Sequence, residues 1–90
     1  MFRYTPTSLL KLEQVFREGG YLVRYEKGSF KPGYCILENK KVIVVNKYFE
    51  TESRINTLLE IFTQVSLDHT SLSDKSKEFI EQLKEAQVKT

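Results

Sequence analysis

The sequence is poor in the residues that cross-link small proteins or bind metals. Its 90 residues include one cysteine, Cys35, one histidine, His69, and no tryptophan. One cysteine excludes a disulfide within the chain, and this predicts a reducing, cytoplasmic location. A structural zinc site takes three or four ligands, mostly cysteine and histidine, so we expect no metal and no cofactor.

Long apolar runs are also absent. The longest uninterrupted run is Val42-Ile43-Val44-Val45, far short of the roughly 20 residues that a membrane-spanning helix needs. The first six residues lack the apolar stretch of a signal peptide. We therefore expect no membrane partner.

The composition is that of an ordinary globular domain. The chain is 40% apolar and 29% charged, which is typical of a globular protein. Its 90 residues are too few for two cores, which predicts one domain over residues 1–90. The net charge of +2 is unevenly distributed. Residues 20–48 carry six basic and two acidic side chains, and residues 49–90 carry five basic and eight acidic ones. The middle of the chain is thus basic and its C-terminal part acidic.

Apolar residues at three- and four-residue spacing predict three helices. They are expected at about residues 7–18, from about residue 52 onward, and at about residues 74–86. Each is preceded by a side chain suited to capping its first turn: Thr5, Thr51 and Ser73. The middle helix has the widest apolar stripe: Ile55, Leu58, Leu59, Phe62 and Val65.

Three strands are predicted between the first and second helices, at about residues 21–26, 34–38 and 41–46. The glycine- and proline-containing segment 27–33 is typical of a turn, and Asn39-Lys40 favours a tight hairpin. The order of elements predicts an α+β domain of two layers, with an N-terminal helix, a three-stranded antiparallel sheet and two C-terminal helices.

The run from Val42 to Val45 breaks the in-out alternation of a strand with one wet face. We therefore expect the third strand to be central or covered on both faces, and a second copy of the chain could supply the cover in a homodimer. The residues predicted for this interaction surface combine the apolar strand with the basic segment around it: Val42, Val44, Lys27, Lys31, Lys40, Lys41 and Lys47.

Two other functions fit parts of the sequence. Cys35 and His69 could form the nucleophile and base of a small hydrolase if the fold brought them together. Basic residues interleaved with aromatic ones could bind single-stranded nucleic acid on a sheet, although a net charge of +2 is below the usual basic footprint of such proteins. The aromatic residues concerned are Tyr21, Tyr25, Phe30, Tyr34 and Tyr48.

The segment 20–68 combines a glycine-rich turn, a short strand containing Cys35, an apolar strand that ends in Asn46-Lys47, and a helix. In this it resembles a family of small bacterial proteins to which no activity is assigned.

The same segment resembles the core of the ImmA/IrrE-type zinc metallopeptidases. Asn46, Arg54 and Glu60 match that pattern, but Leu59 and Thr63 stand where the two zinc-binding histidines would be. The resemblance implies a shared scaffold without the zinc chemistry. We therefore expect a non-enzymatic interaction domain with no catalytic residues.

Overall fold

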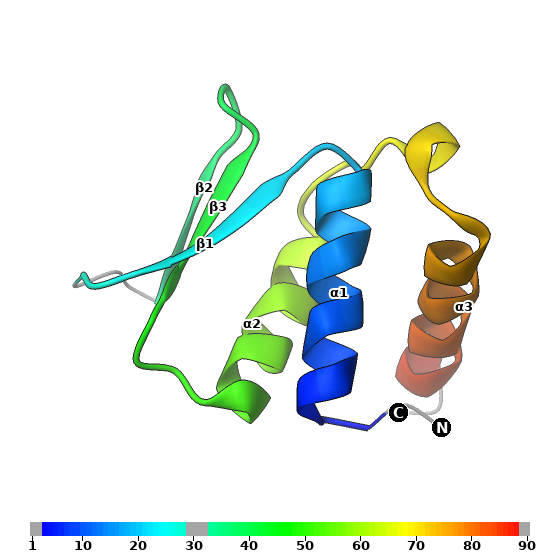
Figure 1. Ribbon diagram of the computed structural model, residues 1–90, viewed down its shortest axis with the longest axis horizontal. Coiled ribbons are helices and arrows are strands. Elements are labelled where there is room, and N and C mark those ends of the chain that lie inside the picture. Colours follow the sequence, from blue (N-terminus) through cyan, green and yellow to red (C-terminus); the bar gives the residue numbers. More distant parts are fainter. Residues whose placement is uncertain (1–2, 29–32, 89–90) are drawn as a thin grey trace.

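The computed structural model describes residues 3–28 and 33–88, with side chains described as far as Lys84. Its elements follow one another along the chain as α1 (Pro6–Glu18), β1 (Leu22–Glu26), β2 (Tyr34–Leu37), β3 (Val42–Asn46), α2 (Thr51–Phe62), the short 3-10 helix η1 (His69–Ser71) and α3 (Asp74–Val88) (Figure 1). The predicted α+β class and the order of helices and strands are confirmed.

The sheet is mixed, so the prediction of a purely antiparallel sheet is wrong. Its strand order is β1-β3-β2, with β3 antiparallel to β2 but parallel to β1. The chain passes through β2 between β1 and β3, and this lets β3 run parallel to β1. The central place of β3 confirms the interpretation of its apolar run: Ile43 and Val45 are fully buried, and Val44 is 9% exposed.

The turn between β2 and β3 is longer than predicted. Leu37 pairs with Val42, so four residues, rather than Asn39-Lys40 alone, connect the strands. Lys41 takes the left-handed conformation with φ of 56°, and this reverses the chain without a glycine.

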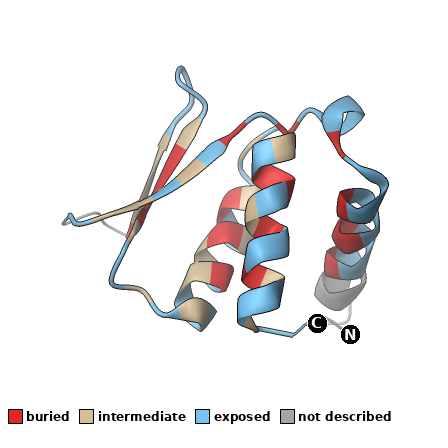
Figure 2. Cartoon of the chain, in the orientation of Figure 1, coloured by how far each residue is buried: buried red, intermediate tan, exposed pale blue. Residues whose placement is uncertain are grey.

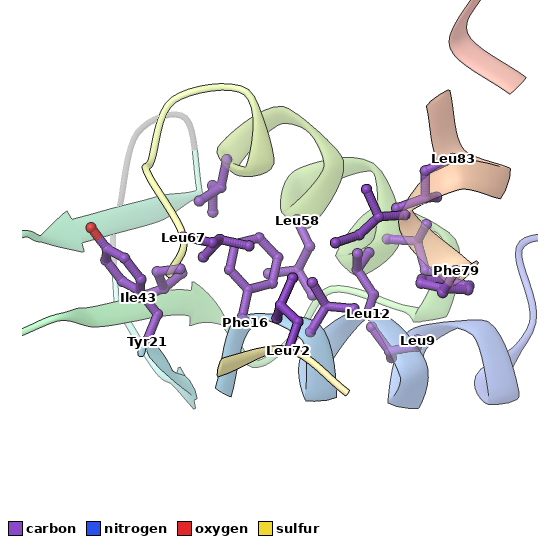
Figure 3. Close-up of a cluster of buried hydrophobic side chains, with 14 of the residues drawn as sticks. Leu9, Leu12, Phe16, Tyr21, Ile43, Leu58, Leu67, Leu72, Phe79 and Leu83 are labelled. Carbon is purple, nitrogen blue, oxygen red and sulfur yellow. The ribbon is translucent and has the colours of Figure 1, made fainter. Parts of the chain in front are cut away.

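The helices lie on one side of the sheet. Figure 1 shows α1 and α2 facing the sheet and α3 packed beyond them, on the side away from the strands. The sheet and the layer of α1 and α2 match the predicted two layers. The structure differs from the prediction in α3, which lies behind the helix layer rather than within it. One core joins these parts: Figure 3 shows it running from Ile43 on the sheet through Phe16 and Leu58 to Leu12 and Phe79.

The apolar stripe of α2 faces this core. Ile55 and Leu58 are fully buried, as the spacing predicted. Ile61 is also fully buried although it was not part of the predicted stripe, whereas Phe62 is half-buried. The ring of Phe62 meets Phe16 edge-on, with centroids 6.2 Å apart, which joins α2 to α1.

Two of the three predicted helix caps are confirmed. The Thr5 hydroxyl accepts a hydrogen bond from the Ser8 amide, and the Ser73 hydroxyl accepts one from the Ser76 amide, both at 3.2 Å. The Thr51 cap is wrong, because Thr51 lies inside α2 and Glu50 precedes it without a side-chain capping bond.

A carboxylate from α1 fixes the start of α3. Glu18 Oε1 accepts a hydrogen bond from the Ser73 amide at 2.9 Å, and Glu18 Oε2 accepts one from Gln14 Nε2 at 2.7 Å. The Ser73 amide, followed by the Gln14 side chain, lowers the pKa of Glu18 to about 2. The charged carboxylate therefore ties α3 to the end of α1.

Candidate interaction surface

Strand register divides the sheet into two faces. Ile43 pairs with Val23 and Ile36, and all three side chains point toward the helices. The alternate positions define the opposite face, which we call the outer face: Leu22, Arg24 and Glu26 on β1, Cys35 and Leu37 on β2, and Val42 and Val44 on β3. Val44 is buried but does not belong to the core cluster, as expected for a side chain on this face.

The outer face is apolar at the end of the sheet next to the turn between β2 and β3. Leu22, Val42 and Leu37 form one row across the three strands, because Val42 pairs with both leucines. Leu22 is 53% exposed and Leu37 is 41% exposed. In the described part of the chain no helix covers this row, since all of them lie on the other side of the sheet (Figure 2). The fold thus leaves an apolar surface in water.

Val44 lies in the next row, between Arg24 and Cys35. Arg24 Nε lies 3.0 Å from Glu26 Oε2, and both side chains are about half exposed. Exposed ion pairs of this kind contribute little stability. The Arg24–Glu26 pair lies on β1, beside the apolar row of the outer face. A polar border of this kind around an apolar surface resembles the rim of a protein interface.

The predicted lysines do not form one patch. Lys40 and Lys41 lie in the turn before β3, whereas Lys27 and Lys47 follow the far ends of β1 and β3, where the Lys47 amide donates to the Glu26 carbonyl. Four steps along β3 at about 3.3 Å each separate the two ends by roughly 13 Å. Lys31 lies outside the described residues.

Two of these lysines lie over tyrosine rings. Lys41 Nζ is 5.1 Å from the centroid of Tyr21, and Lys47 Nζ is 5.7 Å from that of Tyr48. Such contacts hold an ammonium group only weakly at exposed sites. Both lysines therefore remain able to meet an anionic partner.

The tyrosines of β1 and β2 turn away from the outer face. Tyr25 donates a hydrogen bond to Glu13 of α1, and burial, followed by this bond, raises its pKa. The Tyr34 hydroxyl accepts a hydrogen bond from Gln64 at 2.9 Å, and Tyr21 is buried. Of the predicted aromatic set, Phe30 lies outside the described residues and Tyr48 is exposed in the loop after β3.

The structure does not bring Cys35 and His69 together. Cys35 lies on β2 and His69 on η1, and Figure 1 shows these elements on opposite sides of the molecule. Neither side chain therefore has the other as a base or nucleophile.

The residues shared with the metallopeptidase pattern shape the chain around α2. Asn46 Oδ1 accepts a hydrogen bond from the Tyr48 amide at 2.9 Å, which tightens the turn after β3. Arg54 donates to the carbonyls of Phe49 and Lys47, and its guanidinium lies 4.2 Å from the ring centroid of Tyr25. Both residues thus have structural partners.

The other positions of that pattern lack metal ligands. Glu60 is exposed on α2, as its place opposite the apolar stripe predicted. Leu59 packs against the core, and the Thr63 hydroxyl donates to the Glu60 carbonyl at 2.7 Å. In residues 3–28 and 33–84, no three His, Cys, Asp or Glu side chains are grouped so that they could hold a metal ion.

Sequence reasoning missed the two exposed leucines of the outer face, Leu22 and Leu37. Leu22 and Leu37 are the strand neighbours of Val23 and Ile36, so strict alternation along each strand could have placed them on the face opposite the core.

Comparisons with protein-family models, curated proteins and solved structures give no match for this chain. None of the described helices is long and apolar enough to cross a membrane.

Proposed function

We propose that the chain is a non-enzymatic protein-interaction domain that docks another polypeptide on the outer face of its sheet. The observation that carries this proposal is the row of Leu22, Val42 and Leu37, which the fold exposes on the side opposite all described helices. An apolar surface with a polar rim is typical of a docking site.

The arrangement of the aromatic residues favours a polypeptide over nucleic acid. Sheets that bind single-stranded RNA or DNA present aromatic rings on the open face, where bases stack on them. Here Tyr21, Tyr25 and Tyr34 are directed toward the helix side, and the outer face offers aliphatic side chains instead. Aliphatic side chains suit the apolar side chains of a protein partner.

Site-specific photocrosslinking in cells of the native host tests the proposal. A photoreactive amino acid placed at position 22, on the outer face, is expected to give a discrete protein adduct. Leu10 provides a matched control, because it is a leucine on α1 that is 66% exposed and lies on a different element. The adduct from position 22 should disappear when Leu37→Ser is added.

An adduct with a second copy of the chain would support the docking surface and identify a homodimer. The same mixture of adducts from positions 10 and 22 would contradict the proposal, as would the absence of any adduct from position 22.

A further inference from the structure

We infer that the partner of the outer face is an acidic amphipathic helix from another protein, rather than a second copy of this chain. The inference rests on the proposed function and adds the chemistry of the partner. The extent of the outer face and the charge around it carry the argument.

The extent of the outer face suits a single helix. Three strands about 4.8 Å apart and four or five residues long cover roughly 15 Å by 15 Å, or about 225 Å². A stable interface between two folded proteins buries about 800 Å² on each side. The outer face is too small for such a sheet-on-sheet dimer. A helix about 10 Å across spans the roughly 10 Å between the axes of β1 and β2, and three turns, about 16 Å long, match the length of the strands.

The charge around the outer face opposes self-association. The described charged residues on this face and in its flanking turns have a net charge of +3, from five basic and two acidic side chains: Arg24, Lys27, Lys40, Lys41 and Lys47 against Glu26 and Glu38. Two copies packed face to face would place +3 against +3, and like charges across an interface are unfavourable.

The positions of these charges favour a partner that is acidic along its length. One pair of lysines lies at each end of β3, with Arg24 between them on β1. A helix laid along the strands would place its apolar side along β3, with Leu22 and Leu37 on either side of Val42. Glutamate or aspartate on the sides and ends of the helix would then lie near basic groups at both ends of the sheet.

Two synthetic helical peptides of about 14 residues, about 21 Å long, test the inference on the full chain. Both carry leucine on one side, and the other side carries glutamate in one peptide and lysine in the second. Isothermal titration should show at least about tenfold tighter binding of the glutamate peptide at low salt, and this difference should shrink at high salt.

Variants locate the binding. Leu22→Ser with Leu37→Ser should weaken binding of the glutamate peptide about tenfold or more, whereas Leu10→Ser should leave it unchanged. Both leucines on the outer face are exposed, so the double variant should fold, and circular dichroism melting checks this.

Three results would overturn the inference. Equal affinity for the two peptides would show that charge does not select the partner, and binding that survives the double variant would place the peptide elsewhere. Concentration-dependent dimerisation in sedimentation, abolished by the double variant, would identify the second copy as the occupant and leave the docking surface standing. Failure of the peptide tests together with the absence of an adduct from position 22 would refute the docking surface as well.

Discussion

Replacing Leu12 with alanine is expected to lower the free energy of unfolding by about 2–5 kcal/mol. Leu12 is fully buried on α1, and Figure 3 shows it between Leu58 of α2 and Phe79 of α3. The substitution removes apolar contacts and leaves a cavity where three helices meet. Because small domains are stable by only about 5–15 kcal/mol, this loss should be plain in urea denaturation.

Leu10→Ala is the matched control for this prediction. Leu10 is the same residue type on the same helix, two positions earlier, and it is 66% exposed. Its replacement should change the free energy of unfolding by no more than about 0.5 kcal/mol. Similar losses for the two variants would mean that α1 does not present the described side to the core.

Gly33→Ala is also expected to be strongly destabilising. Gly33 has φ of +116°, and an alanine forced into such a conformation costs about 1–3 kcal/mol. The added methyl group would also overlap the ring of Phe49. The Gly33 carbonyl accepts a hydrogen bond from the Asn46 amide at 2.9 Å, so any shift that relieves the overlap disturbs the pairing of β2 with β3.

Gly20→Ala separates the two causes. Gly20 has φ of +101°, and a methyl group there would meet no atom within 4 Å. Its replacement should therefore show the conformational cost alone. Gly33→Ala should be more destabilising than Gly20→Ala by at least about 1 kcal/mol, the lower end of the usual cost of overpacking. Equal effects in thermal or urea unfolding would show that Phe49 moves aside freely.

Local features of the fold could be predicted from the sequence because their causes are local. Thr5 and Ser73 cap helices through amides three residues along the chain, and the spacing of Ile55 and Leu58 alone indicates the buried side of α2. The direction of β1 relative to β3 depends on where the chain crosses between them. Alternation within a strand does not encode this, so the mixed sheet was missed.

The candidate surface was predictable only where it depends on a local pattern along the chain. The unbroken apolar run identified Val42 and Val44, because apolar residues at consecutive positions of a strand place side chains on both faces of the sheet. The grouping of the lysines was not predictable. The parallel pairing of β1 with β3 places Lys27 and Lys47 at one end of the sheet, and the turn places Lys40 at the other.

The most direct test of the docking surface uses Cys35, the one cysteine of the chain, as a native reporter. Cys35 is partly exposed on the outer face and pairs with Val44, so a thiol reagent should modify it in the purified protein. A control variant combines Cys35→Ala with Leu10→Cys, which moves the thiol to an exposed position on α1.

In cells of the native host, a docked partner should slow modification of Cys35 relative to the purified protein, while the thiol at position 10 reacts at the same rate in both. Equal protection at both positions, or unprotected Cys35 in cells, would contradict the account.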